Sequence, residues 1–259
     1  MRWYKLKALM KRDFQISVRA KWRFAELFYF PLSTVIIWGL FAVFTRDFSA
    51  STGLMVLAIN VFWSFSYLSQ SNTNMLMNQD HWSGSLKQVL ASGISEFEYI
   101  SARIISSTIM ALIVMIVMLF VSLGFGLGIF FEQPGITMAL IGVTLFGSIA
   151  MSIIVAALIM YLGREYSFLA WTLLQIFILL SAPLYPLTIL PEVLQTVALA
   201  MPYTQVFLGV RMLIDVGTVP VYVFVNGILV VFVYLILSIP IYYLSFRRAR
   251  KNGMLVDMG

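Results

Sequence analysis

The sequence predicts an all-α integral membrane protein with six transmembrane helices, and three observations carry this prediction. Hydrophobic residues make up 61% of the 259-residue chain, charged residues make up 11%, and the mean hydropathy is +0.94. Apolar windows such as residues 109–120 are continuous, whereas transmembrane β-strands alternate apolar and polar residues. Of 17 Lys and Arg, eight lie in residues 1–23 and four in residues 247–251. A soluble domain of this length could not bury so much apolar surface, so lipid surrounds most of the chain.

Six apolar segments are long enough to cross a hydrocarbon core of about 30 Å. They cover residues 24–44, 53–72, 100–130, 136–162, 167–184 and 221–246. With their short loops they occupy the whole of residues 1–259, so we expect a single transmembrane domain. Six crossings place both basic ends on one side, and the positive-inside rule then puts both termini in the cytoplasm. The expected location is the cell (inner) membrane.

Residues 3–23 have the pattern of an amphipathic helix. Leu6, Met10 and Phe14 recur every four residues and form an apolar stripe. Lys11 and Arg12 lie on the other faces. Such a helix lies in the membrane interface, with its stripe against acyl chains and its cations near anionic headgroups. Docking of a cytoplasmic partner is the alternative.

Several kinds of chemistry lack the residues that they require. The chain has no cysteine and a single histidine, His81, so thiolate catalysis and disulfides are excluded. It contains no HExxH motif, no metal-ligand cluster and no GxxxxGK[ST] phosphate loop, so we expect no metal, no cofactor and no ATPase activity in this chain. Nearly every acid lies at the end of a predicted span or in a loop, which argues against a proton-coupled or sodium-coupled carrier. Nucleic-acid binding is also disfavoured, because the cations flank predicted spans.

Two segments between the spans have patterns of their own. In residues 80–96, Leu86, Leu90 and Ile94 stand at helical spacing and predict a short helix with an apolar stripe. This helix either docks on a partner or lies flat on the membrane. Residues 185–216 are interrupted by prolines, including Pro191 and Pro202, and predict two short helices that enter the outer leaflet and return.

Residues 80–95 carry a specific resemblance. Their sequence, Asp-His-Trp-Ser-Gly-Ser-Leu-Lys-Gln-Val-Leu-Ala-Ser-Gly-Ile-Ser, is similar to a pattern in the permease subunit of type-2 ATP-binding-cassette (ABC) exporters. That pattern is Glu-x-x-x-Gly-[Ser/Thr]-Leu-x-x-x-Leu-x-[Ser/Ala]-Pro-[Ile/Leu]-[Ser/Thr]. Here Asp80 stands for the Glu and Gly93 for the Pro. The outer hairpin resembles that of the same family, with Pro191, Pro202 and Arg211 at matching places.

The resemblance implies a function for nearly the whole chain. It implies a homodimer with separate cytoplasmic ABC ATPase subunits, which bind ATP and Mg and drive export. It implies that residues 80–96 form a coupling helix that contacts the ATPase, through the residues matching the motif: Asp80, Gly84, Leu86, Leu90 and Ile94. The N-terminal helix would help to hold the ATPase, and the outer hairpin would close the exit side.

The cargo is less constrained by the sequence. Aromatic residues are frequent in the first two predicted spans: Trp38, Phe41, Phe44, Phe62, Trp63, Phe65 and Tyr67. Stacked aromatic rings favour an amphipathic or glycan cargo, such as a polysaccharide. A drug, another small amphiphile or a lipid is the alternative cargo, and the alternatives to transport by an ABC complex are a channel or a membrane scaffold.

Overall fold

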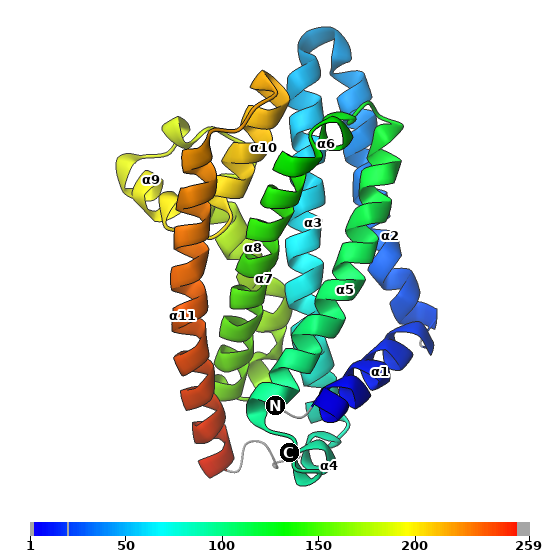
Figure 1. Ribbon diagram of the computed structural model, residues 1–259, viewed down its shortest axis with the longest axis vertical. Coiled ribbons are helices and arrows are strands. Elements are labelled where there is room, and N and C mark those ends of the chain that lie inside the picture. The colour runs from blue at the N-terminus through cyan, green and yellow to red at the C-terminus, as the bar shows by residue number, and fades with distance from the viewer. Residues whose placement is uncertain (1–2, 20, 253–259) are drawn as a thin grey trace.

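The computed structural model describes residues 3–19 and 21–252, and this part of the chain is built of helices joined by turns (Figure 1). Residues 1–2, 20 and 253–259, which belong to the predicted domain, lie outside the described residues. The long helices are α2 (Lys21–Phe44), α3 (Arg46–Trp82), α5 (Glu96–Leu123), α7 (Pro134–Leu162) and α11 (Val221–Lys251). The amphipathic N-terminal segment forms α1, Trp3–Arg19.

All five long helices are long and apolar enough to cross a membrane. The short helices α9 (Glu192–Leu199) and α10 (Thr204–Val216) meet at a bend of 95° and pass the same test only as a pair, as a broken span or a re-entrant loop does. The structure therefore confirms an all-α membrane protein.

The prediction that residues 167–184 form one span was wrong. The 3₁₀ turn η1 (Arg164–Phe168) leads into α8, which covers only Leu169–Leu180. Together they form an apolar helix over Glu165–Leu180, shorter than the about 20 residues that a full crossing needs. Pro183 ends this helix, since a proline disfavours helical geometry in the residue before it, and Ala182 has a positive φ of 50°. The turn η2 (Leu187–Ile189) and the α9–α10 hairpin then continue to the far end of the bundle, where α10 lies in Figure 1.

Three further boundaries differ from the prediction. The second span does not end at residue 72, because α3 continues as a helix to Trp82. The third span ends at Leu123 and not at residue 130, because Gly126, with φ of 94°, opens a turn before the short helix α6 (Ile129–Glu132). The predicted coupling helix 80–96 is reduced to α4, Leu86–Ala91, since its first residues belong to α3.

Helix α3 lies at the centre of the bundle and contacts α2, α5, α7, α8 and α10. Its polar side chains bind its neighbours: the amide of Gln70 donates to the Ala170 carbonyl at 3.2 Å, and that of Asn74 to the Ser152 carbonyl at 3.3 Å. Such bonds stabilise helix packing where water is absent. These contacts fix α3 against α7 and α8.

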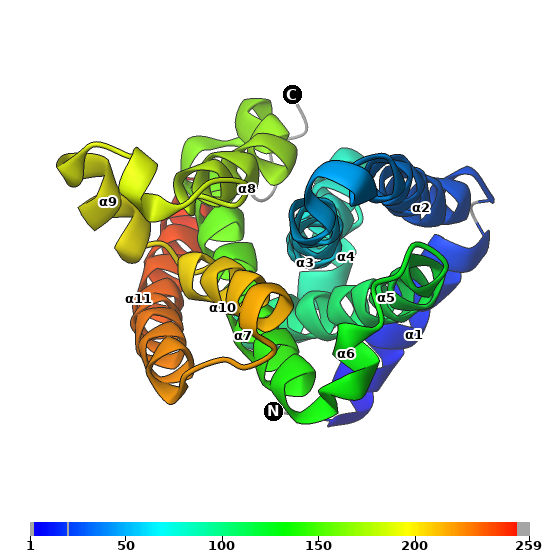
Figure 2. The same ribbon diagram turned by 90° about the horizontal axis from the view of Figure 1, so that it is seen from above.

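The two ends of the bundle differ in what they carry. At one end lie α1, α4 and the last turns of α11, and at the other lie α6, α10 and the turn between α2 and α3 (Figure 1). Seen along the bundle, α2, α3 and α8 lie along one side (Figure 2). This side and the α1–α4 end hold the two sites described next.

Candidate functional site

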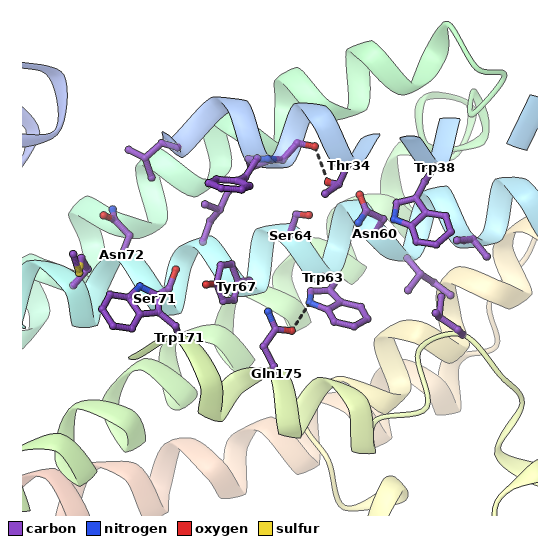
Figure 3. A pocket seen from close by; sticks show the side chains of 18 residues that line it. Thr34, Trp38, Asn60, Trp63, Ser64, Tyr67, Ser71, Asn72, Trp171 and Gln175 are labelled. Atoms are coloured by element: carbon purple, nitrogen blue, oxygen red, sulfur yellow. Dashed lines mark hydrogen bonds between the residues drawn. The ribbon is translucent and has the colours of Figure 1, made fainter. Parts of the chain in front are cut away.

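A groove of about 680 Å³ lies between α2, α3 and α8 (Figure 3). Helix α3 forms its central wall with residues spaced three or four apart, from Val56 to Met75. These positions span about 29 Å at 1.5 Å per residue, which is close to the thickness of the hydrocarbon core. The α3 wall of the groove is therefore about as long as the hydrocarbon core is thick.

The lining combines aromatic rings with neutral polar groups. The rings are those of Phe30, Trp38, Trp63, Tyr67 and Trp171, and the polar side chains are those of Thr34, Asn60, Ser64, Ser71, Asn72 and Gln175. None of the described residues that line the groove is charged. Figure 3 shows the indole nitrogen of Trp63 donating to Gln175 Oε1 at 3.0 Å, which ties α3 to α8 across the groove.

This lining is poorly matched to lipid. Amide and hydroxyl groups that face hydrocarbon without a hydrogen-bond partner are costly, by several kcal/mol each. The side-chain oxygen of Asn60 has no hydrogen-bond partner in the structure. A face of this kind requires water, protein or a polar ligand against it.

The aromatic residues named from the sequence divide between three environments. Trp38, Trp63 and Tyr67 line the groove, whereas Phe62 and Phe65 are buried in the core. Phe41 and Phe44 are exposed. The available signal was the spacing of Asn60, Trp63, Ser64, Tyr67 and Ser71, which places aromatic and polar groups on one face of the second span. The groove itself was not predicted from the sequence.

The second site is a cluster of four charged residues, Arg12, Asp13, Asp80 and Arg103, which we call the charged junction. It joins α1, the last turn of α3 and the start of α5. Arg103 is 0% exposed, and its guanidinium forms ion pairs with both Asp13 and Asp80. Arg12 donates to both carboxylate oxygens of Asp80 at 2.9 Å. Two cations and two anions balance, so the junction has no net charge.

Neutral side chains complete the environment of Asp80. The Tyr99 hydroxyl donates to its Oδ2 and the Ser85 hydroxyl to its Oδ1, each at 2.9 Å. The Arg103 guanidinium also lies 5.0 Å from the centre of the Tyr99 ring. Buried charges are tolerated only when paired and hydrogen-bonded in this way. Within the described part of the chain, no group of three or more His, Cys, Asp or Glu side chains could hold a metal ion.

The segment that matches the family motif is fastened to α1. Leu86 and Val89 of α4 are buried in one cluster with Leu6 and Leu9 of α1. Leu90 and Ile94 are half-buried against the same cluster.

Hydrogen bonds to the backbone just after α4 complete this attachment. The Lys5 ammonium donates to the carbonyls of Ser92 and Gly93, both at 2.8 Å. Gly84 and Gly93 have positive φ of 67° and 73°, which glycine adopts without steric cost. The side chains left outside include Trp82, Lys87 and Gln88. The apolar stripe of this segment thus packs on the chain itself.

Only part of the predicted apolar stripe on the N-terminal helix is buried against protein, and the rest of the stripe is exposed. The buried face of α1 consists of Leu6, Leu9, Asp13 and Ser17. Met10 is half-buried, Lys11 is exposed and Phe14 is 52% exposed. Leu6, which was expected to face acyl chains, is buried against α4, and Asp13, two turns further along the same face, is ion-paired with Arg103. Phe14 stays available to a membrane interface.

The outer hairpin is tied to the loop after α8. Pro191 precedes α9 and is exposed, whereas Pro202 lies buried in the turn between α9 and α10. Arg211 of α10 donates to the carbonyls of Ala182 and Pro183, the latter at 2.7 Å. The guanidinium thereby satisfies two carbonyls left free where α8 ends.

The model of the ABC-2 type transporter family matches residues 4–214, which extend from α1 to α10 and include the groove and the charged junction. The chain belongs to the ABC-2 type transporter family. It is a multi-pass membrane protein and the transmembrane component of an ABC transporter, a family whose permeases work with an ATPase partner. No curated protein matches the chain.

Proposed function

We propose that the chain is the permease of an ATP-driven exporter, working as a homodimer with two separate ATPase subunits, and that its cargo is a neutral glycan or an amphiphile with a glycan headgroup. Both termini would lie in the cytoplasm and the bundle in the cell (inner) membrane. The groove between α2, α3 and α8 carries this proposal, because its α3 wall is about as long as the hydrocarbon core is thick and its described lining is uncharged.

The groove also supports a dimer. The unpaired amide oxygen of Asn60 is costly against hydrocarbon. If two copies turn their grooves toward each other, the polar groups of both line one enclosed, wet path, and only apolar side chains face lipid. Small neutral side chains such as Ser64, on the central wall, would then lie near the dimer axis.

The lining supports the cargo class. Sugar rings present apolar C–H faces that stack on aromatic rings, and hydroxyl groups that bind amides and hydroxyls. Trp38, Trp63 and Trp171 offer the first kind of contact, and Asn60 and Gln175 the second. A strongly anionic cargo would favour cationic side chains in the path. A small neutral amphiphile is the second candidate, because Leu27, Val56 and Ile59 also line the groove.

Coupling to the ATPase would use the exposed side of the 82–95 segment. ATP-driven closure of the ATPase pair would push on Trp82, Lys87 and Gln88, while Asp80 and Leu86 would transmit the movement to α3 and α1. The bonds from Lys5 to Ser92 and Gly93 support this, because they make α1 and α4 move together.

Crosslinking tests the dimer. The chain has no cysteine, so Ser64→Cys creates a unique thiol in the groove. A bis-maleimide should link two Ser64→Cys chains in native membranes. The matched control is Leu229→Cys, on the exposed face of α11. Linkage of the control in place of the groove variant would refute the facing-groove dimer.

Co-purification tests the transporter assignment in cells. The solubilised chain should retain an ABC ATPase at equal stoichiometry, and the reconstituted complex should show ATPase activity stimulated by a neutral oligosaccharide or a glycolipid. Stimulation only by small amphiphiles would select the second candidate. Ion current without ATP would favour a channel instead.

A further inference from the structure

Helix α11 carries a line of exposed apolar side chains along one face. The line consists of residues three or four positions apart: Val225, Leu229, Phe232, Ile236, Ile239 and Tyr243. At this spacing the side chains stack along the helix axis. The line is continuous, and it continues at the same spacing into Arg247 and Arg250.

The end of this line opens into a cleft of about 390 Å³, which we call the basic cleft. It is lined by Glu96 at the start of α5 and by Tyr243, Phe246, Arg247, Arg250 and Lys251 of α11. The three cations are exposed. Against the Glu96 carboxylate they leave a net charge of about +2 in the cleft.

The dimensions fit a membrane lipid. From Phe232 to Tyr243 the helix rises about 16 Å, close to the half-thickness of the hydrocarbon core. Tyr243 stacks on Phe97 with ring centroids 6.2 Å apart, an aromatic pair between the apolar line and the cations. Aromatic residues at this depth mark the membrane–water interface.

We propose that the basic cleft binds one anionic glycerophospholipid of the leaflet at this end of the bundle. Its phosphate would lie between Arg247, Arg250 and Lys251, and its acyl chains along the apolar line. The Glu96 carboxylate would accept from a headgroup hydroxyl, which favours phosphatidylglycerol over a headgroup without donors. Basic pockets on this side of membrane helices suit such headgroups.

The basic cleft differs from the rest of the basic surface, because a neighbouring cation on the same helix does not line it. Arg248, next in sequence to Arg247, faces away and lies 4.0 Å from the centre of the Tyr161 ring. It therefore provides a matched control on the same helix. An acidic surface of the partner ATPase is the alternative occupant, but it would not use the apolar line, which favours a lipid.

The test is native mass spectrometry of the intact complex, released from nanodiscs of phosphatidylglycerol and phosphatidylcholine. The cleft variant is Arg247→Gln with Arg250→Gln, and the control is Arg248→Gln with Arg19→Gln, which removes the same charge elsewhere. The cleft variant should retain phosphatidylglycerol about thirtyfold less well, since each cation near an anionic lipid contributes roughly a factor of five. The control should retain it as the unmodified chain does.

Three results would overturn the proposal. Equal loss in both variants would show diffuse surface charge only. Loss of the ATPase in place of the lipid would show a protein interface. Full competition by glycerophosphoglycerol, which has the headgroup without acyl chains, would show a phosphate site that does not use the apolar line. All substituted arginines are exposed, so melting temperatures should remain equal and exclude misfolding as the cause.

Discussion

The charged junction and the groove are both built on α3, yet they follow opposite rules. The junction, at the α1–α4 end, holds four charged groups of which Asp13, Asp80 and Arg103 are buried and paired. The groove, along the middle of the same helix, has an uncharged described lining and partly exposed side chains. The junction is held by ion pairs within the chain, whereas the groove is lined by neutral aromatic and polar side chains.

This difference shows how one helix can serve two roles. Asp80 of α3 is ion-paired with Arg12 of α1 and Arg103 of α5, so in the proposed coupling a displacement of Asp80 would be shared by all three helices. Because α3 is also the central wall of the groove, the same displacement would alter the groove's shape. The weaker, neutral contacts of the groove can yield without exposing a buried charge.

The largest loss of stability is expected from Arg103→Met. It removes the shared cation and leaves Asp13 and Asp80 with only Arg12 nearby, so the free energy of unfolding should fall by about 3–5 kcal/mol. Thermal unfolding in detergent measures the loss. Arg19→Met, at an exposed position of α1, is the control and should change little. Equal melting temperatures for the two variants would mean that the junction contributes nothing to the fold.

Leu86→Ala and Lys87→Ala compare a buried and an exposed position of α4. Leu86 is 1% exposed, so its truncation should cost about 2–4 kcal/mol of stability. Lys87 is exposed, and its truncation should leave the melting temperature unchanged while weakening retention of the ATPase. Pull-down of the ATPase alongside thermal unfolding separates the two effects. If Lys87→Ala retained the ATPase normally, the ATPase would have to bind another surface of the chain.

The sequence predicts what depends on local pattern. The length of the apolar runs located the long helices, helical spacing located the short helix around Leu86, and the motif at residues 80–95 indicated the family. The pairing of Asp13 with Arg103 could not be found in this way, because the residues are 90 positions apart and neither stands in a motif. Nor could periodicity show that Leu6 packs on α4, since an apolar residue suits lipid and protein equally.

The prediction of a fifth span over residues 167–184 was wrong for a related reason. Residues 167–184 are apolar enough for a span, but α8 ends at Leu180, shortly before Pro183. Hydropathy averaged over a segment reports its composition and does not show where its backbone turns. The groove was not predicted because the packing of the helices, and not the local sequence, decides which side of α3 faces α8.

Arg211→Met should have an intermediate effect. It removes the donors to the Ala182 and Pro183 carbonyls, and a hydrogen bond to a charged group is worth about 1.5–3 kcal/mol. The loss should be local, seen as faster hydrogen exchange in residues 181–190 with little change in α3. Arg46→Met, which removes a bond to the Phe125 carbonyl at the same end of the bundle, should leave that exchange unchanged. Uniform acceleration in both variants would argue against a local tie.

The smallest change in stability is expected in the groove itself. Trp63→Phe keeps an aromatic ring and removes the donor to Gln175, so the fold should lose about 1 kcal/mol or less. Cargo-stimulated ATPase activity should nevertheless fall, because a phenyl ring offers a smaller stacking surface and leaves the amide oxygen of Gln175 without its partner. Phe232→Leu, on the exposed face of α11, controls for a lost aromatic ring that faces lipid. If stimulation persists in Trp63→Phe and falls in Phe232→Leu, the cargo does not pass along α3. If cargo-stimulated ATPase activity falls in Trp63→Phe alone and the fold stays intact, the two sites on α3 have different roles. Loss of the charged junction would destabilise the protein, whereas loss of the Trp63 contact would affect only the cargo.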